Sequence, residues 1–151
     1  MQLFLNIPRV ARAFEYMSVA HAGQMYGDLP YFTHPLAVAE AVKEPTEDEL
    51  VAALLHDVVE DTTRSLQDVA NTFGDRVAGT VDLLTKKPGV KYQDGIMRIV
   101  NSGNRSAIKI KWADNYINMN GDKSHMDQER RDRLNTKYAA SFLTLSSVLG
   151  V

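Results

Sequence analysis

Apolar residues recur every three or four positions along most of the chain, which is the spacing of amphipathic helices. In residues 8–21, Val10, Ala13 and Met17 mark one face, and Pro8 suits the first turn. No alternating strand pattern of any length is present. We therefore expect an all-α, single-domain bundle of seven or eight helices. The remaining predicted helices span residues 34–44, 46–61, 65–73, 75–84, 91–101, 105–119 and 127–149.

Capping signals fix several of these boundaries. Thr46 and Glu49 have the spacing of a capping box, as do Ser65 and Asp68, and each pair precedes a helical pattern. Gly74 is placed to end the helix that follows the second box. The segment between the first two helices, GQMYGDLPYFT, is predicted to be a loop.

The third predicted helix carries an unusual group of charges. Residues 51–55, VAALL, are apolar on every side, and they lead directly into His56-Asp57 and then Glu60-Asp61. In one continuous helix, residues four apart share a face. Because burying charge is costly unless it is paired, we expect a metal-and-water site at the mouth of the core. The alternative is a chance His-Asp pair followed by a solvated acidic helix end.

Composition limits the class of protein. The chain has 151 residues, enough for one domain, and we expect residues 1–151 to form a single unit. Its apolar fraction is 44% and its charged fraction 24%, both ordinary for a globular protein. The net charge is -2 and the 17 basic residues are dispersed, so we expect no nucleic-acid partner. This charge distribution is compatible with a small anionic ligand.

The chain contains no cysteine, so disulfides, thiolate ligands and cysteine nucleophiles are all excluded. The N-terminal segment has no basic region followed by a sustained apolar stretch, and no run approaches the roughly 18 residues of a membrane span. We therefore expect a cytoplasmic protein without a membrane segment. The oligomeric state is not indicated by the sequence.

Two further residues complete a candidate metal site. His34 and Asp114 lie beside apolar helical segments and, with His56 and Asp57, offer two imidazoles and two carboxylates from three helices. Such a mixed set suits Mn²⁺, Fe²⁺ or Zn²⁺ better than Ca²⁺. Structural roles remain open: His34 as a helix cap, Asp114 as a salt-bridge partner, and His21 as a core histidine.

These motifs carry a family resemblance. HAGQ, PYFTHPLAVA, AALLHDVVEDT, FGDRVAGTVDLLTK and IKWADNYINM follow one another over residues 15–120. In this order they resemble the HD-domain hydrolase of the RelA/SpoT family. The chain has no room for the family's synthetase and regulatory domains, so it is most similar to the stand-alone small alarmone hydrolases.

The resemblance implies an all-α HD fold, a small-molecule nucleotide substrate, and Mn²⁺-dependent removal of the 3′-pyrophosphate from (p)ppGpp, which gives GDP or GTP and pyrophosphate. Glu60 and Asp61 match the acidic pair that orients and deprotonates the attacking water, and Asn118 matches a nucleotide-contacting asparagine. The matching metal ligands are His34, His56, Asp57 and Asp114.

Departures from the family pattern concern the substrate. Residues 25–29, which include Tyr26, lie where the family usually has a basic residue and one more position. Asn115 follows Asp114 where the family commonly has Arg or Lys. Tyr26 is compatible with stacking on a base or with packing. Tyr138 resembles a tyrosine that approaches the nucleotide in the small hydrolases, and a core role is the alternative. Replacement charge is available from residues that we expect to be mostly solvated: Arg64, Lys86, Lys87, Lys109 and Lys111.

Three functional hypotheses follow. The first is a metal-dependent (p)ppGpp 3′-pyrophosphohydrolase, and the second is the same chemistry on another nucleotide or phosphoester. The third is a non-catalytic module that binds an alarmone or a protein partner. The sequence retains every candidate metal ligand and both Glu60 and Asp61, which favours a hydrolase over the third hypothesis.

Overall fold

Helix α3, Glu47–Leu55, lies at the centre of the fold. The computed structural model describes residues 3–151, and it buries every residue of α3 from Glu49 onward. The predicted capping box starts this helix: the Glu49 amide donates to Thr46 Oγ1 (3.1 Å) and the Thr46 amide donates to Glu49 Oε2 (3.2 Å). The helices that pack around α3 are α1 (Pro8–Ala20), α2 (Thr33–Ala41), α6 (Asp75–Leu84) and α8 (Arg105–Asn120).

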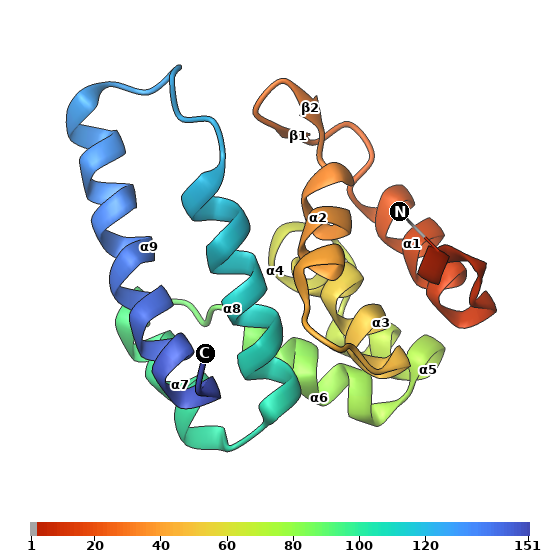
Figure 1. Ribbon diagram of the computed structural model, residues 1–151. Coiled ribbons are helices and arrows are strands. Elements are labelled where there is room, and N and C mark those ends of the chain that lie inside the picture. The colour runs from red at the N-terminus through yellow and green to blue at the C-terminus, as the bar shows by residue number, and fades with distance from the viewer. Residues whose placement is uncertain (1–2) are drawn as a thin grey trace.

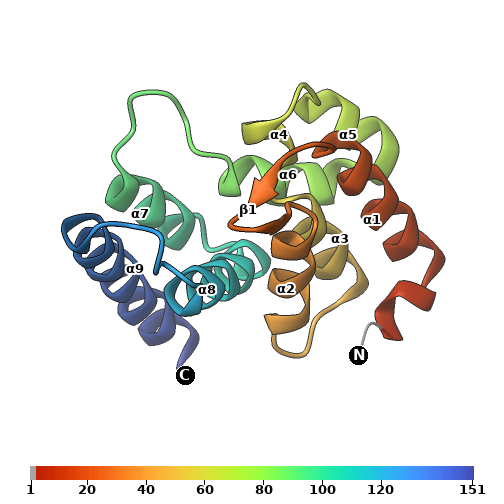
Figure 2. The ribbon, with the colours of Figure 1, turned by 90° about the horizontal axis from the view of Figure 1, so that it is seen from above.

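The predicted all-α fold is confirmed, with eight α-helices longer than one turn among residues 3–151. Figure 1 shows two groups, α1 to α6 and α7 to α9, and Figure 2 shows α8 between α2 and α9. Within the described part of the chain, no helix is long and apolar enough to cross a membrane. The other elements are a 3₁₀ turn at Leu3–Asn6, α4 (Val58–Asp61), α5 (Leu66–Phe73), α7 (Tyr92–Ser102) and α9 (Gln128–Leu149).

The third predicted helix does not run unbroken to residue 61, as the sequence pattern suggested. It ends at Leu55, and the four-residue α4 begins at Val58. The carbonyl of Ala53 accepts a hydrogen bond from His56 Nδ1 (2.7 Å), so a side chain competes for a backbone acceptor of the helix. Asp57, with φ −105° and ψ 0°, then serves as the N-cap of α4. Because of this break, His56-Asp57 and Glu60-Asp61 do not lie on one continuous helix.

The predicted loop after α1 contains a small antiparallel hairpin, so the expectation of no strands was wrong here. Strands β1 (Met25–Tyr26) and β2 (Leu29–Pro30) pair with Tyr26 opposite Leu29. The two-residue turn begins with Gly27 at φ 61°, which suits a glycine-led hairpin turn. Two residues per strand are too few to produce a recognisable alternation. The hairpin lies at the same end of the molecule as the α8–α9 loop (Figure 1).

Candidate active site

Two imidazoles and two carboxylates converge in the core, from α2, the α3–α4 junction and α8. Nε2 of His34 lies 3.0 Å from Asp114 Oδ1 and 3.9 Å from Asp57 Oδ2. Nε2 of His56 lies 3.1 Å from Asp57 Oδ2 and 3.5 Å from Asp114 Oδ1. Both histidines and Asp114 are buried. The structure thus brings together the four residues that the sequence selected as metal ligands.

The donor set fits a divalent metal. Because His56 Nδ1 donates to a carbonyl, Nε2 of the neutral ring carries a lone pair that faces the two carboxylates. Among the described residues, this buried Nε2 has no hydrogen-bond partner. Burial opposes the charged form of His56, but the Asp57 carboxylate prevails and raises the pKa of His56 well above its usual value.

Both carboxylates are held in place by neighbouring side chains. The Tyr31 hydroxyl donates to Asp57 Oδ2, and Lys111 Nζ lies 2.9 Å from Asp114 Oδ2. Burial raises the pKa of Asp114, yet the Lys111 ammonium outweighs it and holds that pKa well below its usual range. Lys111 is therefore a half-buried partner of the cluster, and the expectation that it is a solvated surface lysine was wrong.

The acidic pair lies next to this cluster on α4. Carboxylate oxygens of Asp57, Glu60 and Asp61 all lie within 4.8 Å of one another. Glu60 accepts a hydrogen bond from the Lys86 backbone amide (2.6 Å). Burial, together with the Asp57 carboxylate, raises the pKa of Asp61 to about 6. The structure thus places both acidic side chains at the edge of the candidate metal site.

His21 and Gln24 connect the HAGQ motif to this region. The buried His21 ring packs against Tyr31 (centroids 4.5 Å apart), and its Nδ1 is hydrogen-bonded to Gln24 Oε1 (2.9 Å). Gln24 Nε2 in turn donates to the Asp61 carbonyl (2.8 Å). Tyr31, which the sequence reasoning did not select, lies three residues before His34, and that short spacing was the available signal.

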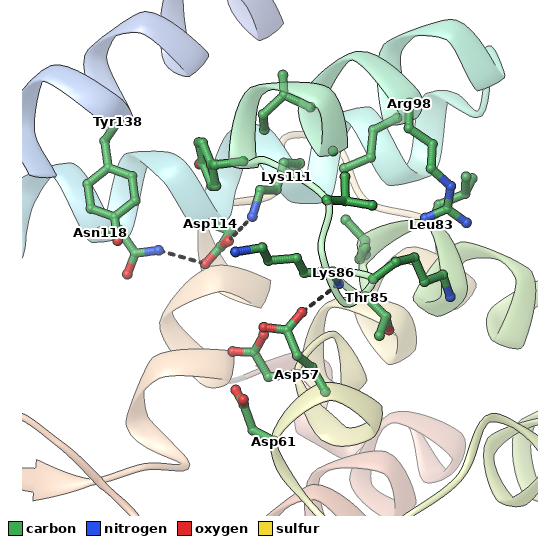
Figure 3. A pocket seen from close by; sticks show the side chains of 18 of the residues that line it. Asp57, Asp61, Leu83, Thr85, Lys86, Arg98, Lys111, Asp114, Asn118 and Tyr138 are labelled. Atoms are coloured by element: carbon green, nitrogen blue, oxygen red, sulfur yellow. Dashed lines mark hydrogen bonds and ion pairs between the residues drawn. The ribbon is translucent and has the colours of Figure 1, made fainter.

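A cavity of about 400 Å³ opens above the cluster. Figure 3 shows Asp57 and Asp61 on one side of it and Lys86 and Lys111 on the other. Lys137 of α9 also lines this space. The sequence reasoning missed Lys137 and Arg98, because their approach to the cavity depends on contacts of α7 and α9 that are distant along the chain.

Two of the five candidate cations lie elsewhere. Lys109 pairs with the buried Glu49 at 2.6 Å, on the far side of α8 from Lys111. The Arg64 guanidinium packs over the Tyr16 ring at 5.0 Å. Neither lines the cavity, so neither supplies the replacement charge that the sequence considered.

Three of the four predicted substrate contacts line the cavity, namely Tyr26, Asn118 and Tyr138. Asn115 does not. It is fully buried, and its Oδ1 accepts a hydrogen bond from the Tyr92 hydroxyl (2.7 Å). The prediction that Asn115 contacts the substrate is therefore corrected: in the structure Asn115 supports Tyr92.

The sequence pattern of the HD domain family matches residues 13–119, which include all four candidate ligands and the acidic pair. The chain belongs to the HD domain family. Members of this family hold a divalent metal, and the His/Asp cluster described above accommodates one.

Curated relatives of this HD domain are long proteins of alarmone metabolism. A probable GTP pyrophosphokinase of Mycobacterium leprae is 51% identical over 85 residues, which are 54% of this chain and 11% of that protein. The bifunctional (p)ppGpp synthase/hydrolase SpoT of Escherichia coli K12 is 41% identical over 92 residues, which are 59% of this chain and 13% of that protein. The chain spans less than a fifth of the length of these relatives, and the resemblance to the RelA/SpoT family is confirmed.

Solved structures match over most of their length. A metazoan ortholog of SpoT that hydrolyses ppGpp aligns with a TM-score of 0.72 and 26% identity, covering 93% of each chain. A protein of Listeria monocytogenes EGD-e aligns with a TM-score of 0.60 and 28% identity, covering 79% of this chain and 83% of the other. The HD domain fold therefore extends over nearly the whole of this chain.

Proposed function

We propose that this HD domain is a metal-dependent hydrolase that removes the 3′-pyrophosphate of (p)ppGpp and yields GDP or GTP and pyrophosphate. The observation that carries the proposal is one cavity that combines the His/Asp cluster, a neighbouring acidic pair and opposing lysines. The metazoan relative that hydrolyses ppGpp, similar over 93% of each chain, supports the assignment of substrate.

In this proposal His34, His56, Asp57 and Asp114 hold the metal. We propose Mn²⁺, the ion that the family resemblance implies, and the mixed imidazole and carboxylate donors suit it. The bound ion supplies Lewis-acid chemistry: it polarises a phosphoryl oxygen and lowers the pKa of a bound water. Lys111 and Asn118 keep the Asp114 carboxylate oriented through contacts of 2.9 and 3.0 Å.

The acidic pair handles the attacking water. Glu60 and Asp61 lie on α4, with carboxylates within 4.8 Å of Asp57, so they can orient a water beside the cluster and accept its proton. Two hydrogen bonds hold α4 at these residues. The Lys86 amide donates to the Glu60 side chain, and the Gln24 side chain donates to the Asp61 carbonyl.

Substrate charge is met by lysines on the opposite wall. Within residues 3–151, neither Lys86 nor Lys137 has a carboxylate partner, whereas Lys111 is paired with Asp114 and Arg98 with Asp82. Burial lowers the pKa of Lys137, and the nearby Lys111 and Lys86 lower it further. Two cations without a carboxylate partner in one cavity favour an anionic ligand, and a polyphosphate ester supplies several negative charges.

A second substrate class has one specific observation in its favour. Tyr26 lies on the hairpin, in the segment where the family usually has a basic residue, and its hydroxyl is already bonded to Asn118 (2.8 Å). A site without that cation suits a nucleotide or phosphoester other than a guanosine 3′-pyrophosphate. The chemistry at the cluster would be unchanged.

The test is release of pyrophosphate from ppGpp by protein loaded with Mn²⁺. We expect GDP and pyrophosphate in equal amounts; metal-loaded protein that leaves ppGpp intact would contradict the proposal. GTP, NADPH and 5′-monophosphates assayed alongside separate the two substrate classes. An enzyme specific for a 3′-pyrophosphate leaves 5′-monophosphates unchanged, whereas preferred turnover of another nucleotide supports the second class.

A further inference from the structure

The two histidines of the cluster are supported differently. Metal-binding histidines usually donate their second ring nitrogen to a carbonyl or carboxylate, which fixes the ring. His56 follows this rule through its bond to the Ala53 carbonyl (2.7 Å). In the part of the chain that the structure describes, the buried Nδ1 of His34 has no hydrogen-bond partner. His34 Nε2 faces Asp114 Oδ1 at 3.0 Å, so on the Nδ1 side of the ring something other than a hydrogen bond must hold His34.

Tyr26 provides that support. Its ring stacks on His34 with the centroids 4.4 Å apart and the planes at 25°, the closest approach to parallel among the ring contacts of His34. Tyr31 and His56 contact the same imidazole at steeper angles of 54° and 60°. A stacked ring limits rotation of the imidazole about its side-chain bonds without using a nitrogen.

The hydroxyl of Tyr26 reaches the other side of the cluster. It donates to Asn118 Oδ1 (2.8 Å), and Asn118 Nδ2 donates to Asp114 Oδ1 (3.0 Å). That same Asp114 oxygen lies 3.0 Å from His34 Nε2. The contacts therefore form a closed circuit of Tyr26, Asn118, Asp114 and His34, with Figure 3 showing the Asn118–Asp114 bond.

Gly121 makes room for this arrangement. It follows α8, and a Cβ built at this position would lie only 3.3 Å from the Tyr26 hydroxyl. The hairpin side chain thus fits against the end of α8 where the chain lacks a side chain.

We propose that Tyr26 is a positioning residue with two separable functions: its ring holds His34 for the metal, and its hydroxyl holds the Asn118 amide for the substrate. The inference rests on the proposed function, because it concerns the same site. It assigns Tyr26 a role that does not require stacking on the nucleotide base. The hairpin then links metal binding and substrate binding through one side chain.

Two substitutions separate the functions. Tyr26→Phe keeps the aromatic face and removes the hydroxyl, whereas Tyr26→Leu removes both. Tyr116→Leu is the matched control, since Tyr116 is an exposed tyrosine on α8 that stacks on Trp112 outside the cavity. Circular dichroism of the metal-free proteins establishes that each variant is folded, and Tyr26→Met is a second non-aromatic variant if Tyr26→Leu is not.

Mn²⁺ alone is titrated first, by calorimetry, without substrate. We expect Tyr26→Leu to weaken Mn²⁺ binding by about tenfold, the lower end of the range for residues that support a metal ligand. Tyr26→Phe and Tyr116→Leu should bind Mn²⁺ as the unmodified protein does. A folded Tyr26→Leu variant with unchanged Mn²⁺ affinity, or a Tyr26→Phe variant weakened equally, overturns the role of the ring.

Kinetics on ppGpp then test the hydroxyl. Tyr26→Phe should raise KM by about fivefold with kcat nearly unchanged, the size expected for one hydrogen bond of about 1 kcal/mol. An unchanged KM overturns the role of the hydroxyl. The calorimetric titration is independent of turnover. If the unmodified protein binds Mn²⁺ but does not hydrolyse ppGpp, the proposed function is wrong. The role of the Tyr26 ring is then still decided by the Mn²⁺ affinity of Tyr26→Leu.

Discussion

The floor and the rim of the cavity are built in contrasting ways. The floor consists of His34, His56, Asp57 and Asp114; all but the half-buried Asp57 are buried, and helices that pack on the central α3 hold them. The rim, which we define as Tyr26, Lys86 and Lys137, comes from a hairpin, a connecting loop and the last helix. Rim residues are half-buried or exposed. The floor can therefore keep one chemistry while the rim lysines change the molecule on which it acts, and Tyr26 contacts both parts.

Removing one floor carboxylate should have the largest effect. Asp57→Asn keeps the size of the side chain but removes a negative charge that faces both imidazoles at 3.1 and 3.9 Å. We expect kcat/KM for ppGpp to fall by about a thousandfold, because metal-assisted stabilisation of several kcal/mol is lost. Mn²⁺ affinity by calorimetry should fall in parallel. Retained activity would show that Asp57 is dispensable and that the floor is assigned wrongly.

Metal removal provides the control for this variant. Dialysis of the unmodified protein against a chelator should abolish turnover, and added Mn²⁺ should restore it. The same addition should leave Asp57→Asn inactive.

Replacement of the acidic pair should separate chemistry from metal binding. The double substitution Glu60→Gln, Asp61→Asn leaves the four candidate ligands intact. We expect kcat to fall by about a hundredfold or more, the usual contribution of a general base, while Mn²⁺ affinity changes little. Steady-state kinetics and calorimetry on the same preparation check both. Unchanged turnover by a variant that binds nucleotide normally would refute the assignment of the pair.

A rim cation should act mainly on KM. Lys137→Gln removes an ammonium that lies 4.2 Å from the Tyr92 ring centroid and has no carboxylate partner among residues 3–151. We expect KM for ppGpp to rise by about tenfold with a smaller change in kcat, because a charge-assisted contact to phosphate is worth about 1.5 kcal/mol or more. Arg133→Gln, an exposed position on the same helix, is the matched control. Equal effects in both variants would mean that Lys137 acts only through the general field of α9.

The sequence predicted the floor of the cavity better than its rim. The capping boxes at Thr46 and Ser65 and the apolar run before His56 are local signals, and they located the helices and the floor residues. The break at His56 was not predictable, because it depends on the Ala53 carbonyl bonding to both the imidazole and the backbone amide of His56. Lys137 reaches the cavity only through packing of distant helices, which no local pattern encodes.

Two lysines on α8 show most clearly what the sequence could not predict. Lys109 and Lys111 flank one apolar residue, and positions two apart on a helix face different directions. The sequence could state that they diverge but not which one faces the cavity. In the structure Lys111 meets Asp114 at 2.9 Å, and Lys109 meets Glu49 at 2.6 Å on the opposite side. One belongs to the site and the other to the scaffold.

That assignment predicts a change in stability without a change in catalysis. Lys109→Met leaves the buried Glu49 without its cation, and breaking such a pair costs about 3 kcal/mol. We expect urea unfolding to show this loss, while KM and kcat for ppGpp at a temperature where the variant is folded stay unchanged. Adding Glu49→Gln should recover part of the stability, because no unpaired buried charge then remains. A KM raised as much as in Lys137→Gln would place Lys109 at the rim, and a loss below about 1 kcal/mol, typical of exposed pairs, would mean that solvent screens Glu49.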